Sequence, residues 1–309
     1  MSEIREVAAG LRFPEGPIAL PDGDVLLVEI ARGTLSRVKP DGRIEVVAET
    51  GGGPNGAAMG PEGTVYICNN GGFRWHEKDG RLLPGYQAPD YSGGRIERVD
   101  LASGRVEVLY SECDGVALRG PNDLVFDRDG GMWFTDHGKI RKRDEDRTGV
   151  YYAKADGSFI TEAIFPVHSP NGIGLSPDEE TLYVAETPTA RLWAYDIAGP
   201  GEIVRGRGEA PWQPGRLLAG MSDYRFFDSL AVDGAGHVCI GTIVKGGITV
   251  VAPDGSGVEH VPVPGDSFAT NICFGGPDLR TAYITLSSTG RLVAMDWPRP
   301  GLPLNFLNS

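Results

Sequence analysis

The sequence predicts an all-β chain in which six four-stranded antiparallel blades surround a central channel, the architecture of a six-bladed β-propeller. Three observations predict this architecture. One short pattern recurs six times, each recurrence is followed by further apolar runs of strand length, and no long stretch shows the apolar period of an amphipathic helix. Repeats of about 40 to 50 residues with four strands each are typical of propeller blades.

The recurring pattern places an oxygen-bearing side chain just ahead of a short apolar run. We call these polar residues the anchors. Successive anchors are 40, 67, 49, 57 and 43 residues apart. Turns of the Asp-Gly and Pro-Asp-Gly type separate the apolar runs, as expected between antiparallel strands. The anchors are Glu15, Asn55, Asn122, Asn171, Asp228 and Asn271.

The last repeat is one strand short. Its runs cover residues 271–274, 282–286 and 291–296, and a proline-rich tail follows. We expect Ile4–Ala8 to supply the missing outer strand, because closing the ring removes exposed sheet edges. Residues 1–309 are then expected to form a single domain.

Extra length interrupts two blades between their second and third strands. In blade two, residues 71–94 are too rich in aromatic side chains for a flexible linker. This insertion is expected either to fold as a flap over one end of the channel or to seal the side of its blade. In blade three, residues 139–147 carry charges of both signs and are expected to form a solvated loop, in which Arg141 or Arg143 is a lesser candidate for holding a substrate carboxylate.

Composition and charge exclude several classes of partner. The formal net charge of −13 disfavours nucleic acids and anionic membranes, because both require basic patches. No apolar run of about 18 residues is present, so no membrane-spanning helix is expected. The first residues lack the apolar stretch of a secretion signal, and the four cysteines show no CxxC spacing. We therefore expect a cytoplasmic protein, whose oligomeric state the sequence does not fix.

The anchors point to a divalent cation. One position repeated around a closed ring brings two carboxylates and four amides close to one axis. Such oxygens are hard ligands, which calcium prefers above all, and no Cys or His stands at an anchor to favour a thiolate or multi-histidine zinc site. The alternative is that Asn and Asp before a strand only form Asx-turns. That alternative explains a single Asn well, but it explains Glu15 and Asp228 less well.

Several segments together resemble those of a known family. They read FPEGP, GPNDLVFDRDGGMWFTD, PNGIGLSPDEETLYVAE, FFDSLAVD and NICFGGPDLRTAYIT. They resemble the family of gluconolactonase, regucalcin (senescence marker protein) and luciferin-regenerating enzyme, over nearly the whole chain and all six blades. The resemblance implies a propeller with one catalytic divalent cation in its channel. Since most characterised members hydrolyse sugar lactones, it also implies a lactonase.

The resemblance assigns metal ligands by motif. The family's ligands fall on Glu15, Asn171 and Asp228, and Asn122 matches a residue that contacts the metal or the substrate. Calcium is the first expectation, while zinc, manganese, magnesium and iron(II) remain open because selectivity rests on geometry and availability.

Two departures from the family's patterns bear on the substrate. The substrate arginine of regucalcin-type members, two positions before the Asn122 anchor, is replaced by Gly120, with Arg119 one position away. Sugar-acid specificity of that kind is therefore not expected. Ser229 stands where paraoxonases have Asn, which argues against that branch.

Other residues receive roles around the cation. Asp228 is the first choice as general base, because a channel carboxylate beside a cation can both bind it and accept a proton. His168 and His137 are the alternative bases and candidate substrate contacts. Substrate contacts are also expected from Asn122, Asn55, Asn271 and Trp75. Asp136 and Glu186, at the ends of second strands, are expected to organise the ring.

The function expected from these residues is metal-dependent hydrolysis of a sugar (aldono-) lactone or a related cyclic ester. One alternative is a hydrolase of a non-sugar ester, favoured by the aromatic insertion and the missing arginine. Another is a non-catalytic propeller that serves as a binding module. A carbon–carbon bond-forming enzyme of the strictosidine synthase kind is the most distant alternative, and metal dependence would separate it.

Overall fold

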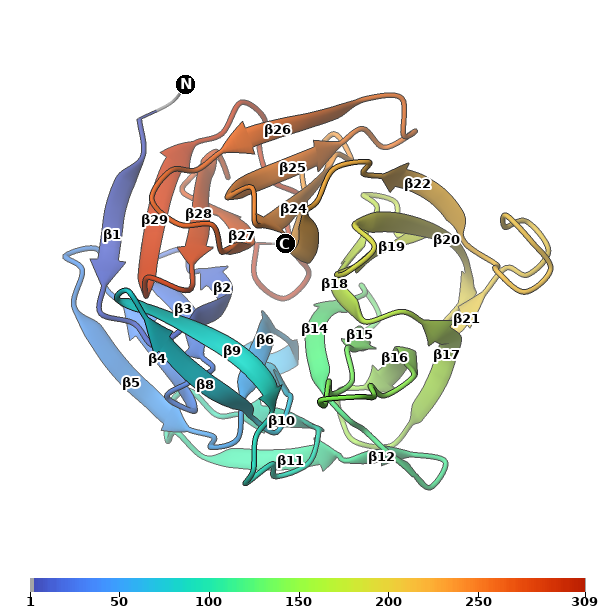
Figure 1. Ribbon diagram of the computed structural model, residues 1–309, viewed down its shortest axis with the longest axis horizontal. Helices are drawn as coiled ribbons and strands as arrows, with labels where there is room; N and C mark the ends of the chain where they lie inside the picture. Colours follow the sequence, from blue (N-terminus) through green and yellow to red (C-terminus); the bar gives the residue numbers. More distant parts are fainter. Residues whose placement is uncertain (1–2, 309) are drawn as a thin grey trace.

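The structure is a computed structural model and describes residues 3–308. Six antiparallel sheets form a ring around a central channel (Figure 1). Six strands, one per blade, lie nearest the axis. They are β2 (Pro14–Ala19), β6 (Pro54–Met59), β14 (Pro121–Phe126), β18 (Pro170–Leu175), β23 (Phe226–Val232) and β27 (Ala269–Gly275). These innermost strands contact one another in this order, and β27 contacts β2, so the ring is closed.

The remaining strands of each blade lie progressively further from the axis. The second strands are β3 (Val25–Glu29), β7 (Val65–Asn69), β15 (Gly131–Asp136), β19 (Thr181–Glu186), β24 (Val238–Ile243) and β28 (Thr281–Leu286). The third strands are β4 (Thr34–Val38), β10 (Arg95–Val99), β16 (Thr148–Lys154), β20 (Arg191–Gly199), β25 (Gly247–Val251) and β29 (Arg291–Asp296). The outer strands are β5 (Ile44–Glu49), β11 (Val106–Tyr110), β17 (Ile160–Val167), β22 (Arg216–Gly220), β26 (Val258–Pro262) and β1 (Arg5–Ala9). Each blade is therefore built on a four-stranded meander, as predicted, and in blade four the short β21 (Glu202–Ile203) also pairs with the end of β20.

The N-terminal strand closes the ring. β1 pairs antiparallel with β29, with Arg5 opposite Ala294 and Ala9 opposite Arg291. This confirms the prediction that the start of the chain completes blade six, with the strand one residue later than expected. The backbone of β29 would otherwise present an unpaired edge to solvent.

The core lies between the blades. Each of six apolar clusters combines side chains from two neighbouring blades, such as Trp133 of blade three with Ile173 and Val184 of blade four. Alternate side chains of each strand therefore pack against opposite neighbours, as in stacked sheets. All four cysteines are buried and unpaired. Residues 3–308 contain no helix that is long and apolar enough to cross a membrane.

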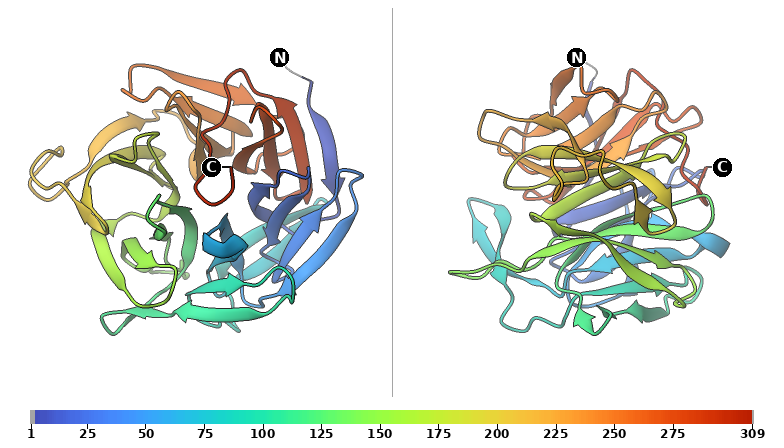
Figure 2. Two further views of the ribbon diagram at one scale, coloured as in Figure 1. Left: turned by 180° about the vertical axis from the view of Figure 1, so that it is seen from behind. Right: turned by 90° about the vertical axis from the view of Figure 1, so that its right-hand side faces the viewer.

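The insertion of blade two forms a hairpin of β8 (Phe73–Lys78) and β9 (Arg81–Gln87), which we call the flap. Its tip reaches blade six, where the Leu82 amide donates to the Ser288 carbonyl at 2.8 Å and Arg81 pairs with Asp266 at 2.9 Å. On the way, Trp75 packs against Phe13 of blade one with 5.1 Å between ring centroids. The flap therefore lies over the ends of blades one and six, and Figure 2 shows it at the opposite face of the ring from the C-terminus.

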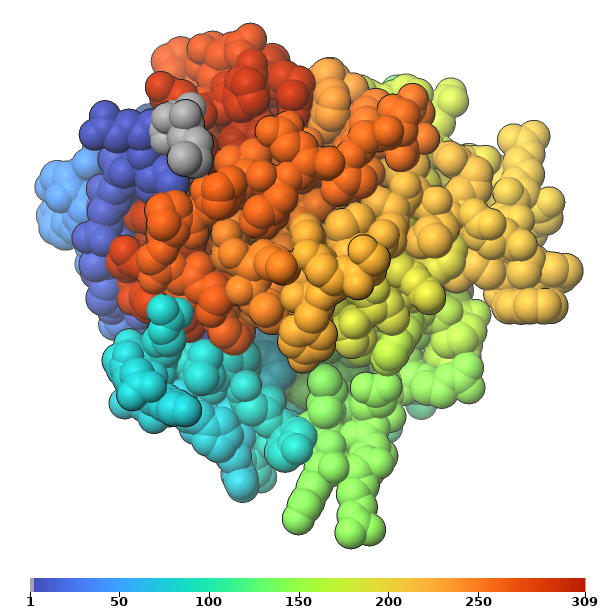
Figure 3. All heavy atoms as spheres, turned by 45° about the horizontal axis from the view of Figure 1, so that its top comes forward, coloured from blue at the N-terminus to red at the C-terminus, as the bar shows by residue number. Residues whose placement is uncertain are grey.

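The charged loop of blade three is not wholly solvated, which corrects the prediction. Lys139 is buried, because the base of the flap covers it: its ammonium donates to Asn70 Oδ1 at 2.8 Å and to the Gly72 carbonyl at 3.0 Å, and it lies 4.0 Å from the centre of the Phe73 ring. The following residues do reach solvent. The surface is hollowed between the flap (cyan) and this loop (light green) in Figure 3.

Deletion of residues 1–9 is expected to lower the melting temperature of the whole domain, because it removes β1 and exposes the edge of β29. Loss of a strand that seals a ring should cost several kcal/mol, or roughly 10 °C for a domain of this size. Thermal unfolding followed by circular dichroism would measure it. Deletion of residues 1–3, which lie before β1, is the control, and an unchanged melting temperature in the longer deletion would contradict this account of closure.

Candidate metal and substrate site

Each innermost strand is irregular at its anchor. The pairing with the second strand shifts register between Glu15 and Ile18 in blade one, and between Pro170 and Ile173 in blade four. The four other blades shift at the equivalent place. An irregularity of this kind re-aims a side chain out of the regular alternation of a strand. The repeated irregularity therefore explains how all six anchors can be directed at the channel.

Glycines that follow three anchors allow neighbouring blades to approach closely. A Cβ atom on Gly172 would lie 2.6 Å from the Asp228 carbonyl oxygen, and one on Gly56 would lie 2.4 Å from the Asn122 carbonyl oxygen. A Cβ on Gly16 would similarly meet the Asn55 carbonyl oxygen at 3.0 Å. Each of these glycines lies against the anchor of the next blade, so the repeated Glu-Gly and Asn-Gly pairs are a packing requirement at the axis.

The predicted metal ligands lie in one buried group at the flap end of the channel. Glu15, Asn122 and Asn171 are buried, and Asp228 is partly exposed to the channel. Within residues 3–308, the buried Asn122 Oδ1 has no hydrogen-bond partner. Asn171 donates its amide to Thr187 Oγ1 at 3.0 Å, and its own Oδ1 receives only a long contact of 3.4 Å from Ser229. Two amide oxygens are thus left for another partner.

Asn271 holds Glu15 instead of offering an open oxygen. Its amide donates to Glu15 Oε2 at 2.9 Å, while its Oδ1 accepts the Ile272 backbone amide at 2.8 Å. The Gly16 amide also donates to Glu15 Oε2, at 3.0 Å. Asn55 is buried at the same level of the ring. These contacts make Asn271 a residue that fixes the orientation of the Glu15 carboxylate.

Three carboxyl groups share this small space without a basic partner. Burial raises the pKa of Glu15 to about 7, against hydrogen bonds that lower it. Burial and the Glu15 charge raise the pKa of Asp123 to about 7. Burial and the charges of Glu15 and Asp123 raise the pKa of Asp228 well above its usual value. Among the described residues none of the three forms an ion pair with Lys, Arg or His. A bound cation would therefore stabilise the ionised form of all three carboxyl groups.

These residues fit a hard divalent cation. Two carboxylates, Glu15 and Asp228, and two open amide oxygens, on Asn122 and Asn171, are the donor types that calcium prefers. In residues 3–308 no three His, Cys, Asp or Glu side chains are grouped as metal ligands by themselves. The amide oxygens would therefore be an essential part of the ligand set, which is how a repeat built mainly on Asn supplies a metal site.

We call the flap end of the channel the mouth. The two candidate histidines lie together on its blade-three and blade-four side. His168 Nε2 lies 3.1 Å from Glu145 Oε1, and its backbone amide donates to Glu186. Burial lowers the pKa of His137 to about 4, so its imidazole is neutral at pH 7, and His168 and Glu145 are among the charges that act on it. The His137 amide donates to the carbonyl of Gly120, the position of the missing arginine.

Aromatic side chains occupy the other side of the mouth. Phe13 and Phe268 shortly precede the anchors Glu15 and Asn271, and their rings meet edge to face at 6.2 Å. Trp75 packs on Phe13 of blade one from the flap, whereas the two histidines belong to blades three and four. The mouth therefore has two unlike sides. The aromatic side chains form an apolar wall on the Glu15 side, and the histidines form a polar wall on the Asn171 side.

Carboxylates at the ends of second strands hold the segments that lead into the anchors. Asp136 accepts the backbone amides of Arg119 and Gly120, both at 2.7 Å. Glu186 accepts that of His168 at 3.2 Å. Both contacts agree with the predicted organising role. Arg141, the lesser candidate for a substrate contact, is occupied by Asp144 and Asp146 of its own loop.

Sequence reasoning missed Asp123 as a member of the buried carboxyl group. It lies one residue after the anchor Asn122, where three other blades have glycine, and it is only 6% exposed. The signal was present in the repeat itself, since an ionisable residue at a position otherwise occupied by Gly, Ser or Ile departs from the pattern.

Comparison with known proteins identifies the family. Residues 13–288 match the SMP-30/Gluconolactonase/LRE-like region, which includes all six anchors. The chain belongs to this family. The predicted resemblance is therefore confirmed over most of the sequence.

The relatives of this family member are distant. A gluconolactonase of Zymomonas mobilis is 25% identical over an alignment of 313 positions, gaps included, which covers 92% of this chain and 79% of that protein. A diisopropyl-fluorophosphatase of Loligo vulgaris is 27% identical over 63% of each chain. Among solved structures, a calcium-binding protein, regucalcin, of Agrobacterium tumefaciens superimposes with a TM-score of 0.73 and 18% identity over 98% of each chain. Distant relatives thus include lactonases and other hydrolases, and the last comparison supports the fold alone.

Substitution of Gly172 by Ala is expected to destabilise the protein by roughly 1–3 kcal/mol and to weaken metal binding, because the new methyl group would push Asn171 away from Asp228. Gly199→Ala is the matched control in the same blade, since a Cβ there meets nothing within 4 Å. Chemical denaturation and calcium titration of both variants would measure the two effects. Equal behaviour of the two variants would refute the close-approach argument.

Proposed function

We propose that this protein is a divalent-metal-dependent lactonase that hydrolyses a sugar (aldono-) lactone or a related cyclic ester. The observation that carries the proposal is the pair of carboxylates, Glu15 and Asp228, placed beside the open amide oxygens of Asn122 and Asn171. A lactonase among the distant relatives, the gluconolactonase, supports the reaction class. Calcium is the proposed ion, supported by the all-oxygen donor set.

The ion would be held by Glu15, Asn171 and Asp228, with Asn122 as a fourth ligand or as a contact to the substrate. When bound, a divalent cation polarises the ester carbonyl and stabilises negative charge on its oxygen. Asn271 keeps the Glu15 carboxylate in place through its 2.9 Å hydrogen bond, and Thr187 does the same for the Asn171 amide. The ligands are thus oriented before the ion arrives, which lowers the cost of assembling the site.

Hydrolysis needs a group that accepts a proton from water. Asp228 is the proposed base, because it is the ring carboxylate that is partly exposed to the channel. Water oxygen bonds to the carbonyl carbon, the ring ester bond breaks, and the leaving alkoxide takes a proton, so the product is a hydroxy acid. His168 and His137, on the polar wall, remain the alternative bases. Asn55 and Asn122 are the proposed contacts to the substrate.

A specific observation favours the second candidate, a hydrolase of a non-sugar ester. The partly exposed Trp75 and Phe268, which pack on the buried Phe13, offer an apolar face on the Glu15 side, and Gly120 offers no cationic group for a sugar acid. A polyol would leave this wall without a suitable partner, whereas a substrate with an apolar substituent would cover it. The hydrolase of diisopropyl fluorophosphate among the relatives supports such a range of substrates.

The test of the function is acid release in weakly buffered indicator solution over a panel of γ- and δ-lactones. The panel combines aldonolactones with alkyl- and phenyl-substituted lactones, and it is run before chelation, after chelation and after return of single divalent ions. Turnover that disappears with chelator and returns with one ion supports the metallolactonase. Turnover restricted to the substituted lactones supports the second candidate. Tight metal binding without turnover on any member would point to another ester or cyclic substrate, whereas neither metal binding nor turnover would favour the binding-module alternative.

Substitution of Glu15 by Gln or of Asp228 by Asn is expected to abolish metal binding and to lower turnover by about a thousandfold or more, because each change removes a charged ligand. Asn55→Ala should retain the metal, since Asn55 is not a proposed ligand. Calorimetric titration with calcium and the lactone assay would measure both properties. Full activity in Asp228→Asn would show that another group accepts the proton.

Removal of the ion by chelation is expected to lower the melting temperature by roughly 5–10 °C. A ligand present at a hundred times its Kd stabilises the folded state by about 2.7 kcal/mol, and the three neighbouring carboxyl groups would lose their counter-charge when the ion leaves. Thermal unfolding with and without chelator would measure the shift. The Glu15→Gln variant is the control, because its melting temperature should not respond to chelator.

A further inference from the structure

A cavity lies below the anchors, at the end of the channel opposite the flap. It has a volume of about 300 Å³ and is lined by the later halves of all six innermost strands. The flap contacts residues that precede the same strands, such as Phe13 and Phe268, which places the two at opposite ends of the channel. We call this cavity the lower chamber. Its upper end reaches the level of the anchors, where it is lined by Gly16, Asp123 and Asn271.

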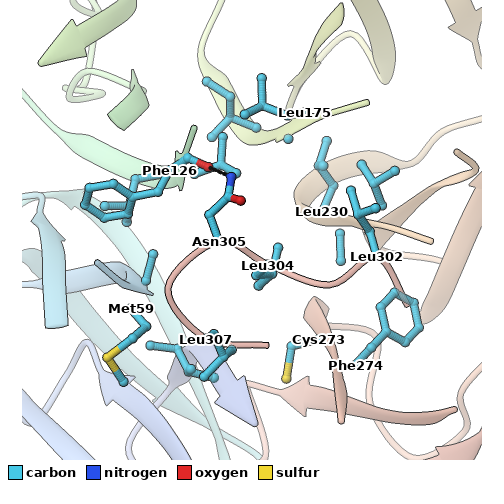
Figure 4. A pocket seen from close by; sticks show the side chains of 18 of the residues that line it. Met59, Phe126, Leu175, Leu230, Cys273, Phe274, Leu302, Leu304, Asn305 and Leu307 are labelled. Carbon is cyan, nitrogen blue, oxygen red and sulfur yellow. Dashed lines mark hydrogen bonds between the residues drawn. The ribbon is translucent and has the colours of Figure 1, made fainter. Parts of the chain in front are cut away.

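The C-terminal tail, residues 301–308, crosses the open end of the lower chamber (Figure 4). The Leu302 amide donates to the Val232 carbonyl of blade five at 3.1 Å. Asn305 donates to the Phe126 carbonyl of blade three at 3.2 Å and to Glu179 of blade four at 2.7 Å. Because the tail is tied to three blades, it is a fixed wall of the chamber.

Most side chains around the lower chamber are apolar. Leu175 and Leu230 come from neighbouring blades, Phe274 from blade six, and Leu302, Leu304 and Leu307 from the tail; Figure 4 shows them around one space. Water in such a space would find few hydrogen-bond partners, and apolar cavities of this kind bind small apolar molecules. The volume also falls within the range of small-molecule sites.

The charges near the lower chamber restrict its ligand to a neutral molecule. Asp123 lines its upper end and offers no positive charge to an anion. The cationic side chain among the lining residues, Arg128, is mostly exposed and already paired with Glu179 at 3.0 Å. An anionic ligand, such as a fatty acid, would therefore meet no free positive charge.

We propose that the lower chamber is a binding site for a small neutral apolar molecule, separate from the site at the flap end of the channel. The juxtaposition that carries this proposal is an apolar channel wall from six blades closed by a tail that is hydrogen-bonded across it. The proposal does not depend on the lactonase function, because it uses neither the metal ligands nor the mouth. An occupant would lie directly beneath Asp123 and would contact both the wall and the tail.

The test uses N-phenyl-1-naphthylamine, a neutral dye whose fluorescence rises in apolar surroundings, titrated into the protein of residues 1–309 in the presence of calcium. We expect saturable fluorescence at one site per chain and a higher melting temperature with the dye. Ala231→Phe, which projects a ring into the chamber from blade five, should weaken dye binding by at least roughly tenfold. Ala58→Leu, from blade two, provides a second filling variant should the first fail to fold.

Two controls make the assignment specific. Ala102→Phe adds the same ring at an exposed position and should leave dye binding unchanged. Trp75→Ala removes an aromatic side chain from the mouth and should also leave it unchanged. Dye binding that survives both filling variants but is lost in Trp75→Ala would place the dye in the mouth and overturn the proposal. No saturable fluorescence at all would mean that the chamber holds only water, which would overturn it equally.

Discussion

The close approach of six strands at the axis is the constraint on which the rest of this structure depends. At three of the six places glycine is the residue that fits, because any Cβ would overlap the backbone of the next blade's anchor. The register shift in each innermost strand occurs at the same level. Together these features set the diameter of the channel and direct the anchor side chains into it. A wider ring would leave Glu15, Asn171 and Asp228 too far apart to share one ion.

The same constraint concentrates negative charge. Three carboxyl groups are gathered where no Lys or Arg side chain of the described chain reaches them, and burial raises the pKa of each. A protein selected only for stability would replace such a group with apolar side chains. Retaining Glu15 and Asp228 is therefore best explained by a cation that compensates them, and the unpartnered Asn122 oxygen points the same way.

The sequence predicted what repeats and missed what depends on contacts between different blades. The six anchors, the strand order within a blade and the closure by the first strand all follow from comparing each segment with its equivalents. Lys139 shows the limit: its neighbours in the sequence are charged, so a solvated loop was predicted, but the flap of another blade covers it. The lower chamber could not be foreseen, because its walls are ordinary strand residues and it becomes enclosed only when the tail crosses three blades.

The two ends of the channel are chemically different, and this difference suggests how a substrate reaches the ring. The tail end is apolar and crossed by residues 301–308, which are hydrogen-bonded to the blades. At the flap end, the hairpin is fixed at its tip by Arg81 and Leu82, so it borders the mouth on one side only. Figure 3 shows the surface hollowed between the flap and the blade-three loop, so this side of the mouth is the more open one. Under the proposed function, a substrate entering there would meet the polar wall first and the aromatic wall behind it, with its ester group at the level of Asp228.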